Sequence, residues 1–571
     1  MMNSEQFDRL EFGYYTGKIK RRDFIKRSLA LGVAATTVMS VASCGEKANE
    51  VQANQRELKT NYDYIVVGAG SAGCVLAANL AEKSGKTVLL VESGDWYAEE
   101  EERDPDSVFV NLGGNKSNNY FFESPAIGNR QMLLATGRGI GGGSRINGSL
   151  WVRGYKQDYD DWESATGSSK WGWANALQKY KYIENFDGET NEYHGYEGKL
   201  YVKQLNNQTE LVEDVLSSAE TAGFQKYSDV NGEMLLGSEG CGTTQGLIKE
   251  NQRFSMLHSY LYPQLENRNL TIVTGKFVSK VFVESGGVCT GIQIVEGEST
   301  KTVYANEETI LSAGAIESPA ILQRSGIGNS ELLSKMGINP VNVLSGVGEN
   351  LRDHVSAGYL FLSPQVNSVP EHRLSAYIMT KSREGLTTPD MQTFLWGPST
   401  EESLKTFLPE VNLPAENLFF LLSTLNKPVS KGSVKISSTD PTSKPIVSPN
   451  YLNEVSDIQA LISAGKALHS MLSSMFAGGY TPLAPFPDSD AEIEALVRSS
   501  ASSLYHYCGT CAMGKAGEAV VDPELKVNGI SKLRVVDASV MPTIPRCNTM
   551  APCVLIGEMA TEFILKKSEI S

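Results

Sequence analysis

Residues 64–73 read Tyr-Ile-Val-Val-Gly-Ala-Gly-Ser-Ala-Gly, a short apolar run that leads into a glycine-rich turn. The next ten residues, 74–83, carry apolar side chains at helical spacing, which predicts a helix. A second apolar run follows at 87–91 and ends at Glu92. Strand, turn, helix and strand within about thirty residues predict the βαβ unit that binds a dinucleotide.

Each residue type in the turn has a physical role. The first glycine permits the tight turn, the second lets backbone amides approach a pyrophosphate, and the third lets helix and strand pack closely. The pyrophosphate would then lie at the positive end of the helix, and a terminal acid would accept hydrogen bonds from the ribose. The predicted site consists of Gly68, Gly70, Ser71, Ala72, Gly73 and Glu92. This motif alone does not separate FAD from NAD.

Length, charge and cysteine usage limit the remaining possibilities. A chain of 571 residues is long enough for about three domains. Its net charge of -15 disfavours binding to nucleic acid or to anionic membrane surfaces. The eight cysteines are too scattered for a disulfide framework. We interpret Cys508 and Cys511 as two buried small residues rather than a redox pair or half a zinc site, and we predict no metal site.

The N-terminus has the features of an export signal. Residues 20–26 are basic and include paired arginines, and an apolar run too short to span a bilayer follows at 29–41. This pattern resembles a twin-arginine signal. Val41-Ala42-Ser43-Cys44 resembles a lipoprotein cleavage box, with ordinary cleavage near Ala42 as the alternative. We therefore expect residues 1–44 to be a signal, residues 45–61 a tether, and the protein a periplasmic one with a lipid on Cys44 as its only membrane attachment.

Five further stretches of the chain carry distinctive motifs. They are TGRGIGGGSRINGSLWVRGYKQDYDDW (136–162), GAIESPAILQRSGIG (314–328), GVGENLRDH (346–354), YHYCGTCAMG (505–514) and LRVVDASVMPTIPRCNTMAPCVLIG (533–557). Together with the glycine loop they resemble the glucose–methanol–choline family of FAD oxidoreductases over residues 62–566. We expect Pro319 in the second of these stretches to lie in the first turn of a helix.

The resemblance implies that the dinucleotide is FAD and extends its site. Further contacts would come from Gly141, Gly142, Asn147 and Gly148 along the pyrophosphate and flavin, the backbone of Val278 at the adenine, Asp537 and Ala538 on the ribitol side, and Asn548 and Met550 at the pyrimidine edge. Met550 replaces an asparagine that is common in the family. Ile146 occupies the position where some members carry the histidine that attaches FAD covalently, so we predict non-covalent FAD.

The resemblance also implies a catalytic pair. His506 matches the family's catalytic histidine, and alcohol oxidation needs a group of near-neutral pKa to take the hydroxyl proton. Asn548 matches the second position and would orient the alcohol oxygen. Of the remaining histidines, we expect His194 and His372 to face solvent and His354 to make a structural hydrogen bond. His258 and His469 lie in helix-like segments, where structural roles are favoured.

The expected fold is α/β. The resemblance implies a Rossmann-like FAD-binding domain built from residues 62–353 and 503–571. Residues 354–502 would form a substrate-binding domain on a largely antiparallel sheet with helices, and segments such as 433–436 alternate as strands do.

The function predicted on this basis is FAD-dependent dehydrogenation of an alcohol or sugar. The envelope location favours a quinone or a cytochrome as electron acceptor. The alternatives are an oxidase that makes hydrogen peroxide, a non-redox lyase that keeps FAD, and a flavin-binding subunit of a larger complex. No cluster in residues 354–502 identifies the substrate.

Overall fold

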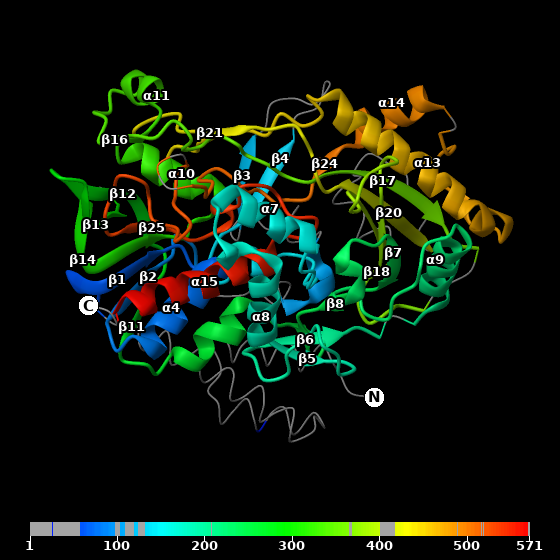
Figure 1. Ribbon diagram of the computed structural model, residues 1–571, viewed down its shortest axis with the longest axis horizontal. Coiled ribbons are helices and arrows are strands. Elements are labelled where there is room, and N and C mark those ends of the chain that lie inside the picture. The colour runs from blue at the N-terminus through cyan, green and yellow to red at the C-terminus, as the bar shows by residue number, and fades with distance from the viewer. Residues whose placement is uncertain are drawn as a thin grey trace.

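The computed structural model describes residue 26 and residues 57–568, except 97–102, 109–118, 124–131, 207, 298, 365–367, 400–416, 488, 516 and 518. Residues 1–25 and 27–56 lie outside the described residues. They include most of the predicted signal, Cys44 and most of the predicted tether. Within the described part, no helix combines the length and apolar character needed to cross a membrane. Two seven-stranded sheets organise the structure (Figure 1).

The first sheet contains the predicted βαβ unit. Its order is β11-β2-β1-β14-β13-β12, with β25 paired to β14. The strands are β1 (Asn61–Val67), β2 (Val88–Val91), β11 (Leu270–Val273), β12 (Phe277–Glu284), β13 (Val288–Glu296), β14 (Ser299–Leu311) and β25 (Leu533–Val535). Strands β11, β2, β1, β14 and β25 pair in parallel, so the ends of β1, β2, β14 and β25 meet at one edge, with Val67 level with Val91 and Leu311. The predicted strands at 64–67 and 87–91 are thereby confirmed.

Two helices pack against each other on this sheet. Helix α4 (Ser71–Lys83) and helix α15 (Met550–Ser568) run side by side although almost five hundred residues separate them (Figure 1, blue and red). Gly557 allows this approach, since a Cβ there would lie 2.9 Å from the Ala72 carbonyl oxygen. A buried hydrogen bond of 2.9 Å joins Asn79 to Glu558 across the contact. The end of the chain is therefore part of the same core as the glycine loop.

Pro319 does not lie in a first helical turn, and that prediction was wrong. Helix α10 spans Gly314–Arg324, which places the proline in its middle. Proline has no N–H to donate to the carbonyl four residues earlier, at Ala315. The Thr510 hydroxyl donates to that carbonyl instead, at 2.6 Å. A residue distant in sequence thus satisfies the acceptor that the proline leaves free.

The second sheet is antiparallel and carries helices on one face. Its order is β23-β17-β20-β19-β18-β7, with β24 paired to β17. The strands are β7 (Gly240–Thr243), β17 (Val355–Leu362), β18 (Leu374–Thr380), β19 (Met391–Ser399), β20 (Leu418–Leu425), β23 (Thr481–Pro482) and β24 (Ser502–Ser503). Helices α9 (Glu210–Thr221), α13 (Val455–Ala477) and α14 (Asp490–Ser500) share a core with one face. The division of the chain at 353 and 503 stays a prediction, but β7 and α9 reach this sheet from the segment before residue 353.

Shorter elements complete the described chain. They are β3 (Asn119–Glu123), β4 (Leu133–Gly137), α7 (Lys156–Thr166), α8 (Trp173–Ile183), β5 (Glu184–Asp187), β6 (Leu200–Gln204), β8 (Gln245–Gly246), β9 (Ile248–Lys249), β10 (Gln252–Arg253), β15 (Ile327–Gly328), α11 (Ser330–Lys335), β16 (Asn342–Val343), β21 (Ser433–Lys435) and β22 (Ile446–Ser448), besides single helical turns. The predicted strand at 433–436 is β21, which pairs with β22 in a separate two-stranded sheet.

Candidate active site

A cavity of about 990 Å³ extends from the glycine loop to the second sheet. Its lining includes Gly68 at one end, Gly358 of β17 at the other, and His506 and Asn548. This volume lies in the range of sites that hold a cofactor or a small substrate. The cavity therefore unites the predicted dinucleotide loop and the predicted catalytic pair.

Most of the residues predicted to hold the cofactor line this cavity. They are Gly68, Gly70, Ser71, Ala72, Glu92, Gly142, Asn147, Gly148, Val278, Asp537, Ala538 and Met550. The two remaining residues, Gly73 and Gly141, contact the backbone of the glycine loop. A Cβ on Gly73 would lie 2.1 Å from the Gly68 carbonyl oxygen, and the Gly141 amide donates to the Ala69 carbonyl at 2.7 Å. The individual cofactor contacts of all these residues stay predictions.

The shape of the loop fits a bound pyrophosphate. Gly68 has a φ of +100°, and a Cβ there would lie 2.4 Å from the Ser312 carbonyl oxygen. A Cβ on Gly142 would lie 2.7 Å from the Cα of Gly70, so the backbone segments pack without side chains. Helix α4 begins after Gly70 with no side-chain cap and no acid in its first turn. Its first amides are thus available to an anion, as a dinucleotide phosphate requires.

Two carboxylates hold the loops of this half together. Glu92 accepts hydrogen bonds from the backbone amides of Ala69, Gly94 and Gly139 at 2.8–3.1 Å. Glu92 thus binds three backbone amides, and its predicted contact with a ribose stays a prediction. Asp537 accepts from the Gly314 amide at 2.9 Å, and burial raises the pKa of its carboxyl group. Glu92 thus joins the carboxyl end of β2 to the loop that follows β1, and Asp537 joins the carboxyl end of β25 to that of β14.

The backbone that carries His506 is held in an unusual conformation. Tyr505 has a φ of +61°, which costs a bulky residue energy and persists only where neighbours enforce it. Asp353 is the neighbour that does so. Its carboxylate accepts from the His506 amide at 2.7 Å and from the Ser503 hydroxyl, which in turn accepts from the Tyr505 amide at 2.8 Å. Burial raises the pKa of Asp353 to about 6.

His354 determines which nitrogen of His506 carries the proton. The Nε2 atom of His354 lies 3.1 and 3.0 Å from the carbonyl oxygens of Asn426 and Pro545, which can only accept, so this nitrogen is the protonated one. Burial lowers the pKa of His354 to about 3, so its Nδ1 has no proton and accepts. The Nδ1 atoms of His354 and His506 are 2.8 Å apart. His506 therefore donates through Nδ1, and its Nε2 is unprotonated, with a lone pair that can accept.

Asn548 faces that lone pair. Its Nδ2 atom lies 3.3 Å from His506 Nε2, and its Oδ1 accepts from Gln392 Nε2 at 3.4 Å. Beside it, the Met550 sulfur lies 3.1 Å from Asn147 Nδ2. The structure thus brings the predicted pair His506 and Asn548 into contact at the wall of the cavity. An alcohol oxygen placed between them would meet one acceptor and one donor.

A buried ionic cluster anchors the segment before Asn548. Asp158 of α7 accepts from the backbone amide of Arg546 at 2.8 Å and from its guanidinium at 2.6 Å. Lys427 lies 3.1 Å from the same carboxylate and donates to the Ile544 carbonyl at 2.6 Å. Because Pro545 accepts a hydrogen bond from His354, this cluster positions both His354 and Asn548.

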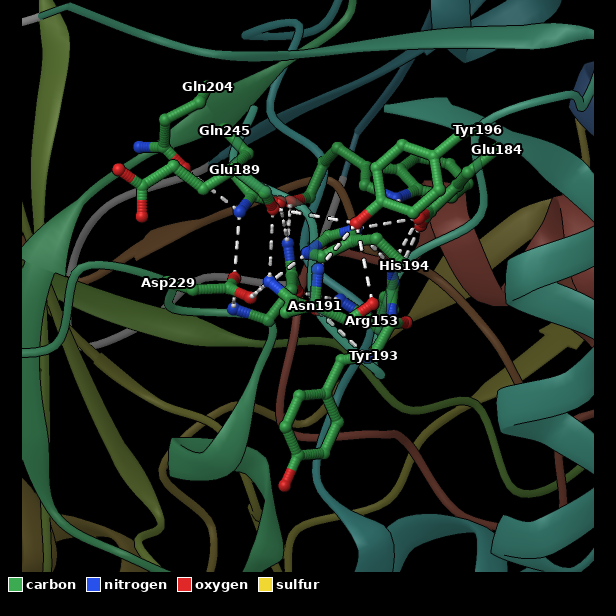
Figure 2. A network of polar contacts seen from close by, with 12 residues as sticks. Arg153, Glu184, Glu189, Asn191, Tyr193, His194, Tyr196, Gln204, Asp229 and Gln245 are labelled. Atoms are coloured by element: carbon green, nitrogen blue, oxygen red, sulfur yellow. Dashed lines mark hydrogen bonds and ion pairs between the residues drawn. The ribbon is translucent and has the colours of Figure 1, made fainter. Parts of the chain in front are cut away.

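The predicted exposure of His194 and His372 was wrong. His194 is 1% exposed and belongs to a network that also contains Arg153, Glu184 and Asp229 (Figure 2). Its ring nitrogens lie 2.8 Å from Glu184 Oε2 and 3.1 Å from Asp229 Oδ2. His372 is fully buried, with Nδ1 2.6 Å from a carboxylate oxygen of Asp106. Polar neighbours in sequence predicted exposure, but the carboxylates that contact the two histidines lie up to 266 residues away along the chain.

The interpretation of Cys508 and Cys511 as buried small residues is confirmed. Both are free, fully buried thiols, and burial raises the pKa of Cys508 to about 12. In the part of the chain that the structure describes, no group of three or more His, Cys, Asp or Glu residues is arranged to hold a metal ion.

Three site residues were not identified from the sequence. We predicted a structural hydrogen bond for His354, and the structure confirms hydrogen bonding but directs it to His506. Asp353 and Gln392 were not considered, although each contacts a member of the pair. The Asp-His ending of the stretch 346–354 is a signal that points to the first two residues. Gln392 lies within an ordinary strand and has no such signal.

Comparison with known proteins agrees with this geometry. The two family models described as GMC oxidoreductase match residues 62–356 and 428–557. The chain is 31% identical over 547 residues to an alcohol dehydrogenase [acceptor] of Pseudomonas putida, covering 89% of this chain and 97% of that protein. It is 33% identical to an oxygen-dependent choline dehydrogenase of Klebsiella pneumoniae subsp. pneumoniae, covering 88% and 96%.

A solved structure is similar along the same length. The crystal structure of pyridoxine 4-oxidase from Mesorbium loti has a TM-score of 0.80 and 28% sequence identity, and the match covers 88% of this chain and 98% of that one. The family establishes that the cofactor is FAD, and the glycine loop and the cavity fit a bound dinucleotide. The chain belongs to the GMC oxidoreductase family, and it is an FAD-dependent oxidoreductase that acts on CH–OH donors.

Proposed function

We propose that this protein is a dehydrogenase that oxidises an alcohol to a carbonyl compound and passes the electrons to an acceptor other than oxygen. The observation that carries the proposal is the unprotonated Nε2 of His506, which results from the bond to His354 and faces Asn548 in the cavity. This arrangement provides a base and a hydrogen-bond donor for one alcohol oxygen.

Each residue has a defined part in the reaction. His506 Nε2 takes the hydroxyl proton, and alkoxide character on the oxygen promotes loss of hydride from the carbon. Asn548 Nδ2 donates to that oxygen and holds it beside the imidazole. His354 keeps His506 in the tautomer that can accept a proton. FAD, when bound along Gly68, Gly70 and Gly142, supplies the hydride acceptor.

The acceptor and the location are part of the same proposal. The signal-like residues 1–44 favour export to the periplasm and a lipid on Cys44. A quinone or a cytochrome in the envelope could then receive the electrons. The relative from Pseudomonas putida carries the word acceptor in its name, which supports this class, whereas the choline dehydrogenases that are similar to this chain are named oxygen-dependent.

An anaerobic experiment separates the alternatives. Purified holoprotein is mixed with a panel of alcohols and sugars without oxygen, and the flavin absorbance is followed. A dehydrogenase loses its flavin absorbance and then reduces a dye or quinone, with little oxygen uptake in air. Rapid oxygen uptake with peroxide formation would favour the oxidase, and turnover with the flavin fully oxidised would favour the lyase.

We expect kcat/KM for flavin reduction to stay constant at neutral pH and to fall only well below pH 6.5. Burial lowers the pKa of His506 the most, and the proximity of His354 lowers this pKa further. The imidazole loses its capacity as a base when the pH falls through that lowered pKa, so the acidic limb of the profile moves down. A stopped-flow profile of flavin reduction with an alcohol that does not ionise measures this limb. An inflection at or above pH 6.5 would contradict the assignment.

We also expect the flavin to be released by acid precipitation. Ile146, at the position where some family members attach FAD through histidine, is 3% exposed, lines the cavity and has no nucleophilic atom. All flavin absorbance should therefore appear in the supernatant after the protein is precipitated and removed. Flavin that stays with the washed precipitate would show a covalent link.

A further inference from the structure

Gly358 of β17 occupies a position where the backbone does not require glycine. It does not have a positive φ, and glycine in the middle of a strand costs stability. Its strand partner is Leu422 of β20. A Cβ added at Gly358 would meet only the Leu422 Cδ1 atom, at the ordinary contact distance of 3.8 Å. The missing side chain instead leaves open space in the cavity that also contains His506 and Asn548.

The side chains around Gly358 form an apolar floor. Leu360, Phe394, Phe420 and Leu422 line the cavity from three neighbouring strands, and Leu360 is paired with Phe420 and Phe394 with Leu422. Alternate residues of these strands, such as Phe419 and Leu421, belong to the core shared with α13 on the other face. The face toward the cavity is therefore a hydrophobic surface against which a ligand can pack.

The charged side chains that line the cavity all have partners. Among the described residues they are Glu92, Lys276, Glu317 and Asp537. Glu92 and Asp537 accept backbone hydrogen bonds, Lys276 pairs with Glu296, and Glu317 pairs with Arg324. The described floor residues offer no carboxylate to a cation. The hydroxyl of Ser356, two residues before Gly358 on β17, lines the cavity but already donates to the Ser502 carbonyl at 3.3 Å, so a sugar would leave most of its hydroxyl groups unpaired against leucine and phenylalanine.

We propose that the chamber above Gly358 takes uncharged alcohols with a bulky apolar body, an aryl or alicyclic group, and that Gly358 determines this specificity. The carbinol lies between His506 and Asn548, and the apolar body fills the space left by the missing side chain. This inference rests on the proposed function, because it names the substrate class of the same site.

The test compares substrates of different size and charge on the holoenzyme without oxygen. For the wild-type protein we expect kcat/KM for flavin reduction to be at least about tenfold higher with 4-methoxybenzyl alcohol or cyclohexylmethanol than with choline, glucose or 1-propanol. Gly358→Val should lower kcat/KM about tenfold or more for the two bulky alcohols and leave 1-propanol nearly unchanged. Valine suits a strand, so the substitution is compatible with the fold.

Thr380→Val is the matched control. Thr380 ends β18 in the same sheet, is half-buried, and does not line the cavity, so this variant should keep the wild-type ratios. If Gly358→Val does not fold, Gly358→Ala tests the same loss of space for the substrate with one added carbon.

The outcomes separate this inference from the proposed function. Preference for choline or glucose, or an equal loss of all alcohols in Gly358→Val, overturns the inference and leaves alcohol oxidation in place. Absence of flavin reduction by every alcohol overturns the proposed function itself. A selective loss of the bulky alcohols supports both.

Discussion

His506→Ala is expected to lower kcat for flavin reduction by a factor of about 10²–10⁴ while FAD remains bound. The variant removes the nitrogen that accepts the hydroxyl proton. It leaves Asn548, the glycine loop and the apolar floor in place, so substrate and cofactor should still bind. Stopped-flow flavin reduction gives the rate, and the flavin-to-protein absorbance ratio gives cofactor content.

Two further variants test how His506 works. His354→Phe removes the acceptor for His506 Nδ1–H and should also lower kcat, because the imidazole is no longer held in the tautomer with a free Nε2. The acidic limb of the pH profile of flavin reduction should also shift in the His354→Phe variant, which a purely structural loss would not produce. His469→Ala is the control, since this half-buried histidine on α13 does not line the cavity. Full activity of His506→Ala with FAD bound would refute the proposed mechanism.

Glu184→Ala is expected to lower the free energy of unfolding by about 3–5 kcal/mol. Arg153 and Glu184 form a fully buried ion pair (Figure 2). Trp151 Nε1 also donates to Glu184 at 2.5 Å. Although burial acts to raise the pKa of Glu184, Arg153 and His194 hold it below its ordinary value. The alanine variant leaves a buried guanidinium and an indole N–H without their acceptor. Urea denaturation of the holoprotein, compared at equal FAD occupancy, measures the loss.

Arg498→Ala supplies the contrast. Arg498 pairs with Glu494 on the exposed surface of α14, where solvent screens the charges and the pair contributes little. The unfolding midpoint of this variant should stay close to that of the wild type. Equal shifts in both variants would show that burial does not decide the value of these ion pairs. The Glu184 contribution should also fade as the pH drops below the ordinary glutamate range, because a lowered pKa stabilises only the ionised form.

The parts of the fold that were predicted correctly depend on neighbours in sequence. The loop at 68–73 follows β1 and opens α4, and glycine, apolar runs and the terminal Glu92 all lie within about thirty residues. Steric limits on the backbone and local hydrophobic spacing are sufficient there. Pro319 shows the limit of such reasoning. Its place in α10 depends on the hydroxyl of Thr510, which the local sequence does not contain.

The catalytic site shows the same division. His506 and Asn548 were named through the resemblance to a family, and the structure places them in contact. Which nitrogen of His506 carries the proton followed only from the position of His354 against two carbonyl oxygens. His194 and His372 have polar neighbours in sequence yet are buried, because their carboxylate partners come from other segments. A histidine's environment is set by the groups around it in space, and these groups are not its neighbours along the chain.

By itself, then, the sequence determined the dinucleotide loop, the parallel strands that meet beside it and, through its motifs, the family and the candidate pair His506 and Asn548. Backbone sterics and short-range hydrophobic periodicity act between adjacent residues, so a linear reading captures them. Only the tertiary structure decided the tautomer of His506, the buried network around Glu184 and the open space above Gly358. Hydrogen-bond direction, desolvation and free volume depend on which distant segments pack together.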